Sequence, residues 1–117
     1  MFEQRDQIRV LRASIPAFDC IPGCHDCCGP VLASSEEVSR LPRKTAAQRE
    51  QALADYNCVH LGENGCTVYS ERPLICRLFG TTPRLPCPHG RAPAVMVAPQ
   101  IDRQIARFLI EIRQVLI

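Results

Sequence analysis

The chain has 117 residues, of which 46% are hydrophobic and 22% charged, a composition typical of one globular domain and not of a disordered chain. Its formal net charge is only +2, so no excess of positive charge indicates binding to nucleic acid or to an anionic membrane. No apolar signal segment and no run of about 18 apolar residues is present. We therefore expect a cytoplasmic protein with a single cysteine-cluster domain over residues 1–117.

Eight cysteines are an unusually high number for a chain of this length. A reducing cytoplasm does not sustain structural disulfides, so clustered cysteines there more often bind metal or take part in redox chemistry. We favour metal binding.

The N-terminal region predicts a helix followed by a loop. Phe2, Ile8 and Leu11 recur at helical spacing, so residues 2–13 should form an amphipathic helix. Residues 16–31 contain three prolines, two glycines and four cysteines, which is typical of an irregular loop around a small object.

Two capping boxes follow this loop. Ser34 with Glu37 three residues later predicts the start of a short helix. Thr45 with Gln48 repeats the pattern and predicts a helix over about residues 45–56. We expect the two helices to form a hairpin between the two groups of cysteines.

The second half predicts a β-hairpin, two helices and a loop. Residues 57–70 combine the turn signal ENG with β-branched and aromatic residues, which favours a hairpin. Residues 70–80, with Pro73 near the first turn, predict a short helix, and residues 81–99 predict a proline-rich loop. Residues 100–117 predict a helix that should face the core, although a protein partner or a second copy of the chain can cover such a face. Its apolar stripe consists of Ile101, Ile105, Phe108, Leu109, Ile112, Val115 and Leu116.

The run DCIPGCHDCCGP holds four cysteines within nine positions: Cys20, Cys24, Cys27 and Cys28. Thiolates two or three residues apart can reach one ion from a tight turn, and four of them give the tetrahedral geometry of zinc and iron–sulfur centres. Because adjacent side chains diverge, Cys27 and Cys28 are poorly placed to bind one ion together. The loop therefore predicts either two four-thiolate sites that share it, or one site and a spare thiol.

The other four cysteines are spread over 30 residues: Cys58, Cys66, Cys76 and Cys87. Eight thiols divide into two four-thiolate sites, but the count alone does not decide the pairing. Four thiolates on a divalent ion leave a charge near −2, which backbone N–H groups and cations must compensate. Arg72, Arg77 and the start of the helix after Pro73 are candidates, with surface solvation as the alternative for the arginines.

The histidines near the cysteines, and the cysteines themselves, also allow alternatives to a site made of thiolates alone. His25, His60 and His89 can each replace a cysteine as ligand through a ring nitrogen. A Cys/His nucleophilic dyad is a further alternative, although no local signature of such an enzyme is present. The vicinal pair Cys27–Cys28 would also suit a thiol redox or disulfide-exchange protein.

The combined motifs resemble a known family. The motifs that carry the resemblance are, in chain order, the run CIPGCHDCC, Cys58, the run CTVYSERPLICR, and Cys87 followed by PHG. Together they are similar to the YkgJ-like cysteine-cluster family, called CxxCxxCC, which is described as a zinc- or iron-chelating domain. The resemblance covers about residues 20–90. Its implied metal ligands are Cys20, Cys24, Cys27, Cys28, Cys58, Cys66, Cys76 and Cys87. The first spacing here is C-x3-C, whereas the family has C-x2-C. This departure affects Cys20, the cysteine that is matched to the first position of the family's pattern. Some relatives are lysine N-methylases acting on flagellin, a role not carried over to this chain.

We therefore expect a mainly α, small metal-bound domain with an irregular cysteine-rich centre and a short β-hairpin. The predicted function is that of a cytoplasmic protein chelating zinc or iron through clustered cysteines. The alternative is an iron–sulfur protein with redox or methylase-related activity. The expected partner is a metal ion, with no nucleic acid and no membrane. The sequence decides neither for nor against enzyme activity.

Overall fold

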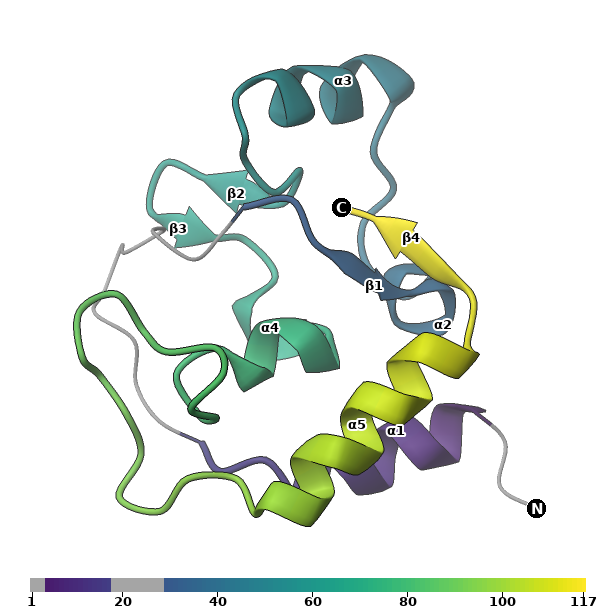
Figure 1. Cartoon of the computed structure of the whole chain (residues 1–117). Coiled ribbons are helices and arrows are strands. Elements are labelled where there is room, and N and C mark those ends of the chain that lie inside the picture. The colour runs from purple at the N-terminus through teal and green to yellow at the C-terminus, as the bar shows by residue number, and fades with distance from the viewer. Residues whose placement is uncertain (1–3, 18–28) are drawn as a thin grey trace.

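The computed structural model describes residues 4–17 and 29–117 (Figure 1). Within these ranges the chain is mainly helical, and its short strands form two two-stranded antiparallel sheets. The elements in chain order are α1 (Gln4–Ala13), β1 (Leu32–Ser34), α2 (Ser35–Val38), α3 (Ala46–Ala54), β2 (Leu61–Gly62), β3 (Gly65–Cys66), the 3-10 turn η1 (Tyr69–Glu71), α4 (Leu74–Leu78), α5 (Pro99–Glu111) and β4 (Gln114–Leu116). The predicted mainly α fold with a short hairpin is confirmed. None of the helices described here is long and apolar enough to cross a membrane.

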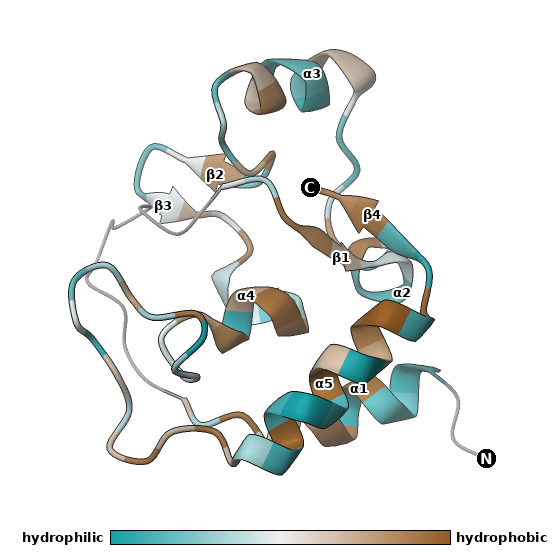
Figure 2. Ribbon diagram, viewed as in Figure 1, coloured by the Kyte–Doolittle hydropathy of each residue, from teal (hydrophilic) through white to brown (hydrophobic). Residues whose placement is uncertain are grey.

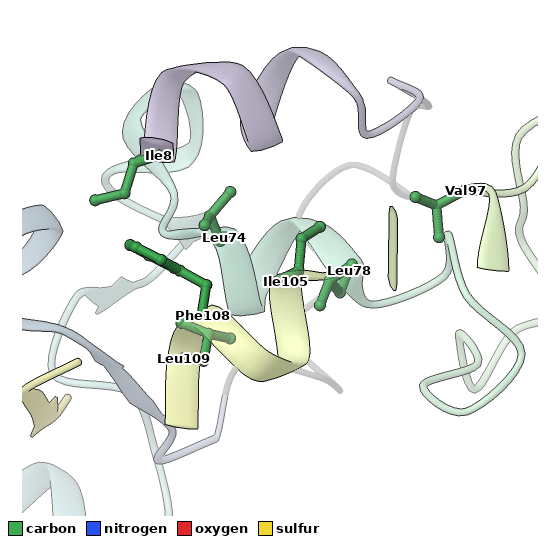
Figure 3. Packing of buried hydrophobic residues seen from close by; sticks show 7 residues of the cluster. All are labelled: Ile8, Leu74, Leu78, Val97, Ile105, Phe108 and Leu109. Carbon is green, nitrogen blue, oxygen red and sulfur yellow. The ribbon is translucent and has the colours of Figure 1, made fainter. Parts of the chain in front are cut away.

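The hydrophobic core lies where α1, α4 and α5 meet (Figure 3). Leu74 and Leu78 of α4 and Ile105 of α5 are completely shielded from solvent. Apolar and polar residues alternate along α1 and α5 at helical spacing, so each helix has one apolar face (Figure 2). The core residues are Ile8, Leu74, Leu78, Val97, Ile105, Phe108 and Leu109.

Both predicted N-caps are present. Thr45 and Gln48 form the complete capping box at the start of α3, with each side chain bound to the other's backbone N–H. At α2, Ser34 Oγ accepts from the Glu37 N–H at 3.2 Å, as predicted. The Glu37 carboxylate does not complete the box in the usual way; its oxygens accept from the Ser34 hydroxyl and from the backbone of Leu74.

The prediction that these two helices form a hairpin is wrong. α2 packs against β1 and β4, whereas α3 lies apart from it at the far end of the molecule (Figure 1). The physical reason is that α3 consists mostly of alanine and polar residues and so offers little apolar surface for α2 to cover.

The predicted C-terminal helix over residues 100–117 is too long. α5 ends at Glu111, and Ile112 is extended with φ −105° and ψ 165°. The Gln114 side-chain amide donates to the Leu109 carbonyl and so satisfies one backbone acceptor at the helix end. Ile112 still packs against the core, so its place in the apolar stripe is correct although it is not helical.

The last residues form β4, which pairs with β1 in antiparallel register, Ala33 opposite Val115. Val31 and Ile117 extend the ladder through reciprocal backbone bonds of 3.1 and 2.9 Å. Pairing gives these backbone groups partners, and it turns Ile117 inward while Leu116 points out. The helical spacing of residues 112–117 gives no sign of this strand, because its pairing partner lies about 80 positions earlier in the sequence.

The loop between α4 and α5 is tied to both helices. Val97 N–H donates to the Thr81 carbonyl at 2.8 Å. Asp102 in the first turn of α5 accepts from the Thr82 hydroxyl and from the Arg84 guanidinium through both of its oxygens. The loop that carries Cys87 is therefore fixed at its two ends.

Candidate metal centre

The four downstream cysteines are all free thiols of intermediate exposure. Cys58 follows α3, Cys66 ends β3, Cys76 lies within α4, and Cys87 lies in the loop between α4 and α5. The upstream cluster of Cys20, Cys24, Cys27 and Cys28, together with His25, falls outside the described residues. The structure therefore bears on half of the predicted ligand set.

The β2–β3 hairpin brings Cys66 back towards Cys58. Leu61 pairs with Cys66 in the hairpin register, and the Leu61 N–H donates to the Cys58 carbonyl at 3.0 Å. The close turn also depends on Gly62, because a Cβ atom there would lie 2.7 Å from Thr67 Cγ2. The predicted hairpin over residues 57–70 is confirmed in its centre, and it joins two thiols that lie eight positions apart.

Cys76 and Cys58 lie close enough to other thiols for those thiols to affect their pKa values. Burial raises the pKa of Cys76 to about 12, with further contributions from the neighbouring Cys58 and Cys66 thiols. Burial also raises the pKa of Cys58, opposed by the N–H of His60 and assisted by Cys66. Such electrostatic effects require proximity. Three separate elements, a turn, a hairpin strand and a helix, thus bring Cys58, Cys66 and Cys76 into one group.

Cys58 and Cys87 lie in two turns of the same construction. At Cys58 the N–H of His60, two residues on, donates to Sγ at 3.4 Å, and the next N–H donates to the Cys58 carbonyl. At Cys87 the N–H of His89 donates to Sγ at 3.4 Å, and the N–H of Gly90 donates to the Cys87 carbonyl at 3.0 Å. Backbone N–H donors directed at sulfur stabilise a thiolate, so both turns suit a metal ligand.

The histidines of these turns differ in their surroundings. His60 is buried, 2% exposed, and burial lowers its pKa, with Lys44 acting in the same direction. Its Nδ1 has no hydrogen-bond partner among the described residues. His89 in the matching turn is exposed. One imidazole is therefore enclosed in the turn at Cys58, whereas the other is exposed.

The arginines predicted to compensate thiolate charge have different roles. Arg72 lies close enough to Cys76 to lower its pKa, and its guanidinium also stacks 3.9 Å from the Tyr69 ring centroid. Arg77 donates to the backbone carbonyls of Arg72 and Ser70 at 2.8 and 2.7 Å. Arg72 is thus a charge partner of the thiol group, whereas Arg77 braces the turn that precedes α4.

The start of α4 is not left open to the thiols. The N–H of Leu74, its first residue, donates to Glu37 Oε2 at 2.8 Å. Sequence reasoning finds only one of the two roles of Glu37. Its position three residues after Ser34 indicates the cap of α2, but nothing in the sequence indicates its bond to Leu74.

No three His, Cys, Asp or Glu side chains within residues 4–17 and 29–117 are arranged closely enough to hold one metal ion. The described thiols therefore form an electrostatic group and not a closed coordination shell.

Comparison with known proteins rests on the family match. No curated protein and no solved structure matches the chain. The CxxCxxCC family, described as "Putative zinc- or iron-chelating domain", matches residues 19–102, a range that contains all eight cysteines and the whole thiol group. The chain therefore belongs to the CxxCxxCC family.

Proposed function

We propose that this protein binds zinc or iron through its cysteines and that the metal holds its loop-rich half together. The observations that support the proposal are the family match and the arrangement of Cys58, Cys66 and Cys76, three partly buried thiols that separate elements bring near one another. Buried thiols without a cation stay protonated, and a bound metal ion favours their thiolate form. A bound metal ion would thus hold together elements that the fold already brings near one another.

The donor set fits such an ion chemically. Soft sulfur ligands suit zinc and iron. The N–H of His60 contacts Cys58 Sγ, and the buried Nδ1 of the same residue has no hydrogen-bond partner within residues 4–17 and 29–117. Positive charge near the group comes from Arg72 and Lys44. When bound, the ion would supply cross-links between turn, hairpin and helix that a core of this size lacks.

We further propose that the upstream cluster completes the ligand set, within a single cytoplasmic domain. The proposed ligands are Cys20, Cys24, Cys27, Cys28, Cys58, Cys66, Cys76 and Cys87. They form two centres if Cys27 and Cys28 serve different ions, and one centre with spare thiols otherwise. Replacing Cys27 and Cys28 separately with serine, and counting bound metal in each variant, distinguishes these arrangements.

The decisive experiment is metal analysis of the full chain purified anaerobically and reconstituted with zinc or with iron. We expect stoichiometric metal, a lower melting temperature after a strong chelator, and a metal deficit in Cys58→Ser or Cys76→Ser. Ser39→Ala, which removes an exposed hydroxyl directly after α2, is the control and should keep its metal. A protein that takes up neither metal, and whose melting temperature the chelator leaves unchanged, would contradict the proposal.

The same preparation tests the iron–sulfur alternative. N–H···S bonds at Cys58 and Cys87 are among the contacts that tune the potential of an iron–sulfur cluster. A brown anaerobic product with broad absorbance near about 400 nm would identify a cluster. A colourless product with stoichiometric zinc would exclude it. A reversible change in thiol count in folded, metal-free protein would instead indicate disulfide exchange.

A further inference from the structure

His60 is buried, and one of its ring nitrogens has no partner in the part of the chain that the structure describes. Its side chain is 2% exposed, and Nδ1 forms no hydrogen bond with the described residues. Of the buried side-chain nitrogens and oxygens in the described ranges, no other lacks a partner. A buried polar atom is normally paired because losing water without a replacement is unfavourable. The enclosed nitrogen therefore requires an explanation.

The backbone of His60 is fixed on both sides by other contacts. Its N–H donates to Cys58 Sγ at 3.4 Å, and its carbonyl accepts from both the N–H and the hydroxyl of Thr67, at 2.9 and 2.6 Å. These three bonds lock the residue between the Cys58 turn and the end of the hairpin. None of them uses the imidazole, so they fix the backbone of His60 and leave its Nδ1 available.

The turn itself does not require a buried ring. His89 occupies the equivalent position after Cys87, with the same 3.4 Å N–H···S contact, and is exposed. Burial of the imidazole is thus a specific property of the Cys58 turn. That turn is also the one whose thiol belongs to the group with Cys66 and Cys76.

We propose that His60 Nδ1 is a metal ligand in the centre that contains Cys58, which gives this centre a mixed sulfur and nitrogen ligand set. The proposal rests on metal binding as proposed above and adds a ligand beyond the cysteines. A neutral imidazole with its proton on Nε2 presents a lone pair at Nδ1, and both zinc and iron accept histidine nitrogen.

Charge favours the same assignment. Four thiolates on a divalent ion leave a net charge of about −2, whereas three thiolates and one imidazole leave about −1. The cations whose effect reaches Cys58 and Cys76 are Lys44 and Arg72, one for each thiol. Replacing one thiolate by the neutral His60 ring lowers the negative charge that these two side chains must compensate.

X-ray absorption at the zinc edge of the zinc-loaded full chain tests the proposal. Zinc–sulfur bonds of about 2.3 Å and zinc–nitrogen bonds of about 2.0–2.1 Å separate into distinct shells, and an imidazole adds outer-shell scattering. We expect a mixed shell in the wild type, an all-sulfur or sulfur–oxygen shell without imidazole scattering in His60→Leu, and at least tenfold weaker zinc binding in that variant. His89→Leu and His25→Leu are the matched controls and should retain the imidazole scattering.

The outcomes separate the two proposals. Zinc bound by sulfur alone in the wild type, or imidazole scattering that persists in His60→Leu, overturns the role of His60 and leaves metal binding intact. A wild type that binds no zinc or iron overturns both. If His60→Leu does not fold, nitrogen-15 spectra of the zinc-loaded wild type decide instead. A His60 ring with a metal-bound Nδ1 and a protonated Nε2 supports the proposal, and a metal-free Nδ1 bonded to water overturns it.

Discussion

The carboxylate of Glu37 accepts a hydrogen bond from the backbone N–H of Leu74 at 2.8 Å, across 37 positions of the sequence. Its other oxygen accepts from the Ser34 hydroxyl at 2.7 Å. One buried side chain thus joins the start of α2 to the start of α4, the helix that carries Cys76. The thiol group depends on this link because α4 has only five residues and little stability of its own.

Glu37→Ala should destabilise the protein by about 1–3 kcal/mol, because it removes the acceptor of a fully buried N–H. Glu37→Gln should lose less, since its amide oxygen can still accept from Leu74. Urea unfolding monitored by circular dichroism measures both. Glu36→Ala, next to it and partly exposed, is the control. Equal stability of Glu37→Ala and Glu36→Ala would show that the link contributes nothing.

Glu37 should also make stability depend on pH. Burial raises its pKa above the ordinary value of 4.5, against the opposing effect of its hydrogen bonds to Ser34 and Leu74. Between 4.5 and the raised value, the folded protein keeps a proton that the unfolded chain has lost. The free energy of unfolding should therefore fall as pH rises through this window and stay level above it, relative to Glu37→Gln. A difference between the two proteins that rises with pH there would contradict this prediction.

Tyr56→Gly should stabilise the protein by about 0.5–1 kcal/mol. Tyr56 has φ 56° and ends α3, where the N–H groups of Tyr56 and Asn57 return to the Leu53 and Ala52 carbonyls in a Schellman motif. Glycine adopts this left-handed conformation without strain, and the tyrosine ring is 82% exposed and contributes little packing. Thermal melts measure the gain. Tyr56→Ala removes the ring but keeps the strain, so it should show no comparable increase.

Ile105→Ala should destabilise the protein by about 2–5 kcal/mol, because it opens a cavity in the core. Ile105 is completely buried between α4 and α5, whereas Ile110 on the same helix is 82% exposed. Ile110→Ala, which makes the same change on the opposite face, should alter stability by no more than about 0.5 kcal/mol. Denaturant unfolding of both variants measures the contrast. Similar losses in the two would mean that Ile110 is covered in solution.

The sequence predicted those features that depend on neighbouring residues. Helix starts at Ser34 and Thr45 were correct because a capping side chain bonds to a backbone group three residues away. The hairpin that returns Cys66 towards Cys58 was correct because a short turn sets its register. The cysteine spacing, taken with the residues around it, also predicted the family to which the chain belongs.

Tertiary structure alone decided the features that depend on distant residues. Apolar spacing at the C-terminus fitted a longer helix, but pairing with β1 gave those backbone groups partners and ended α5 at Glu111. The capping motif at Glu37 is visible in the sequence, whereas its bond to Leu74 exists only because α2 and α4 both pack against β1. The same holds for His60 and His89, which follow cysteines at the same spacing. Only the packing around the Cys58 turn buries one ring and leaves the other in solvent, because burial depends on neighbours that no local pattern specifies.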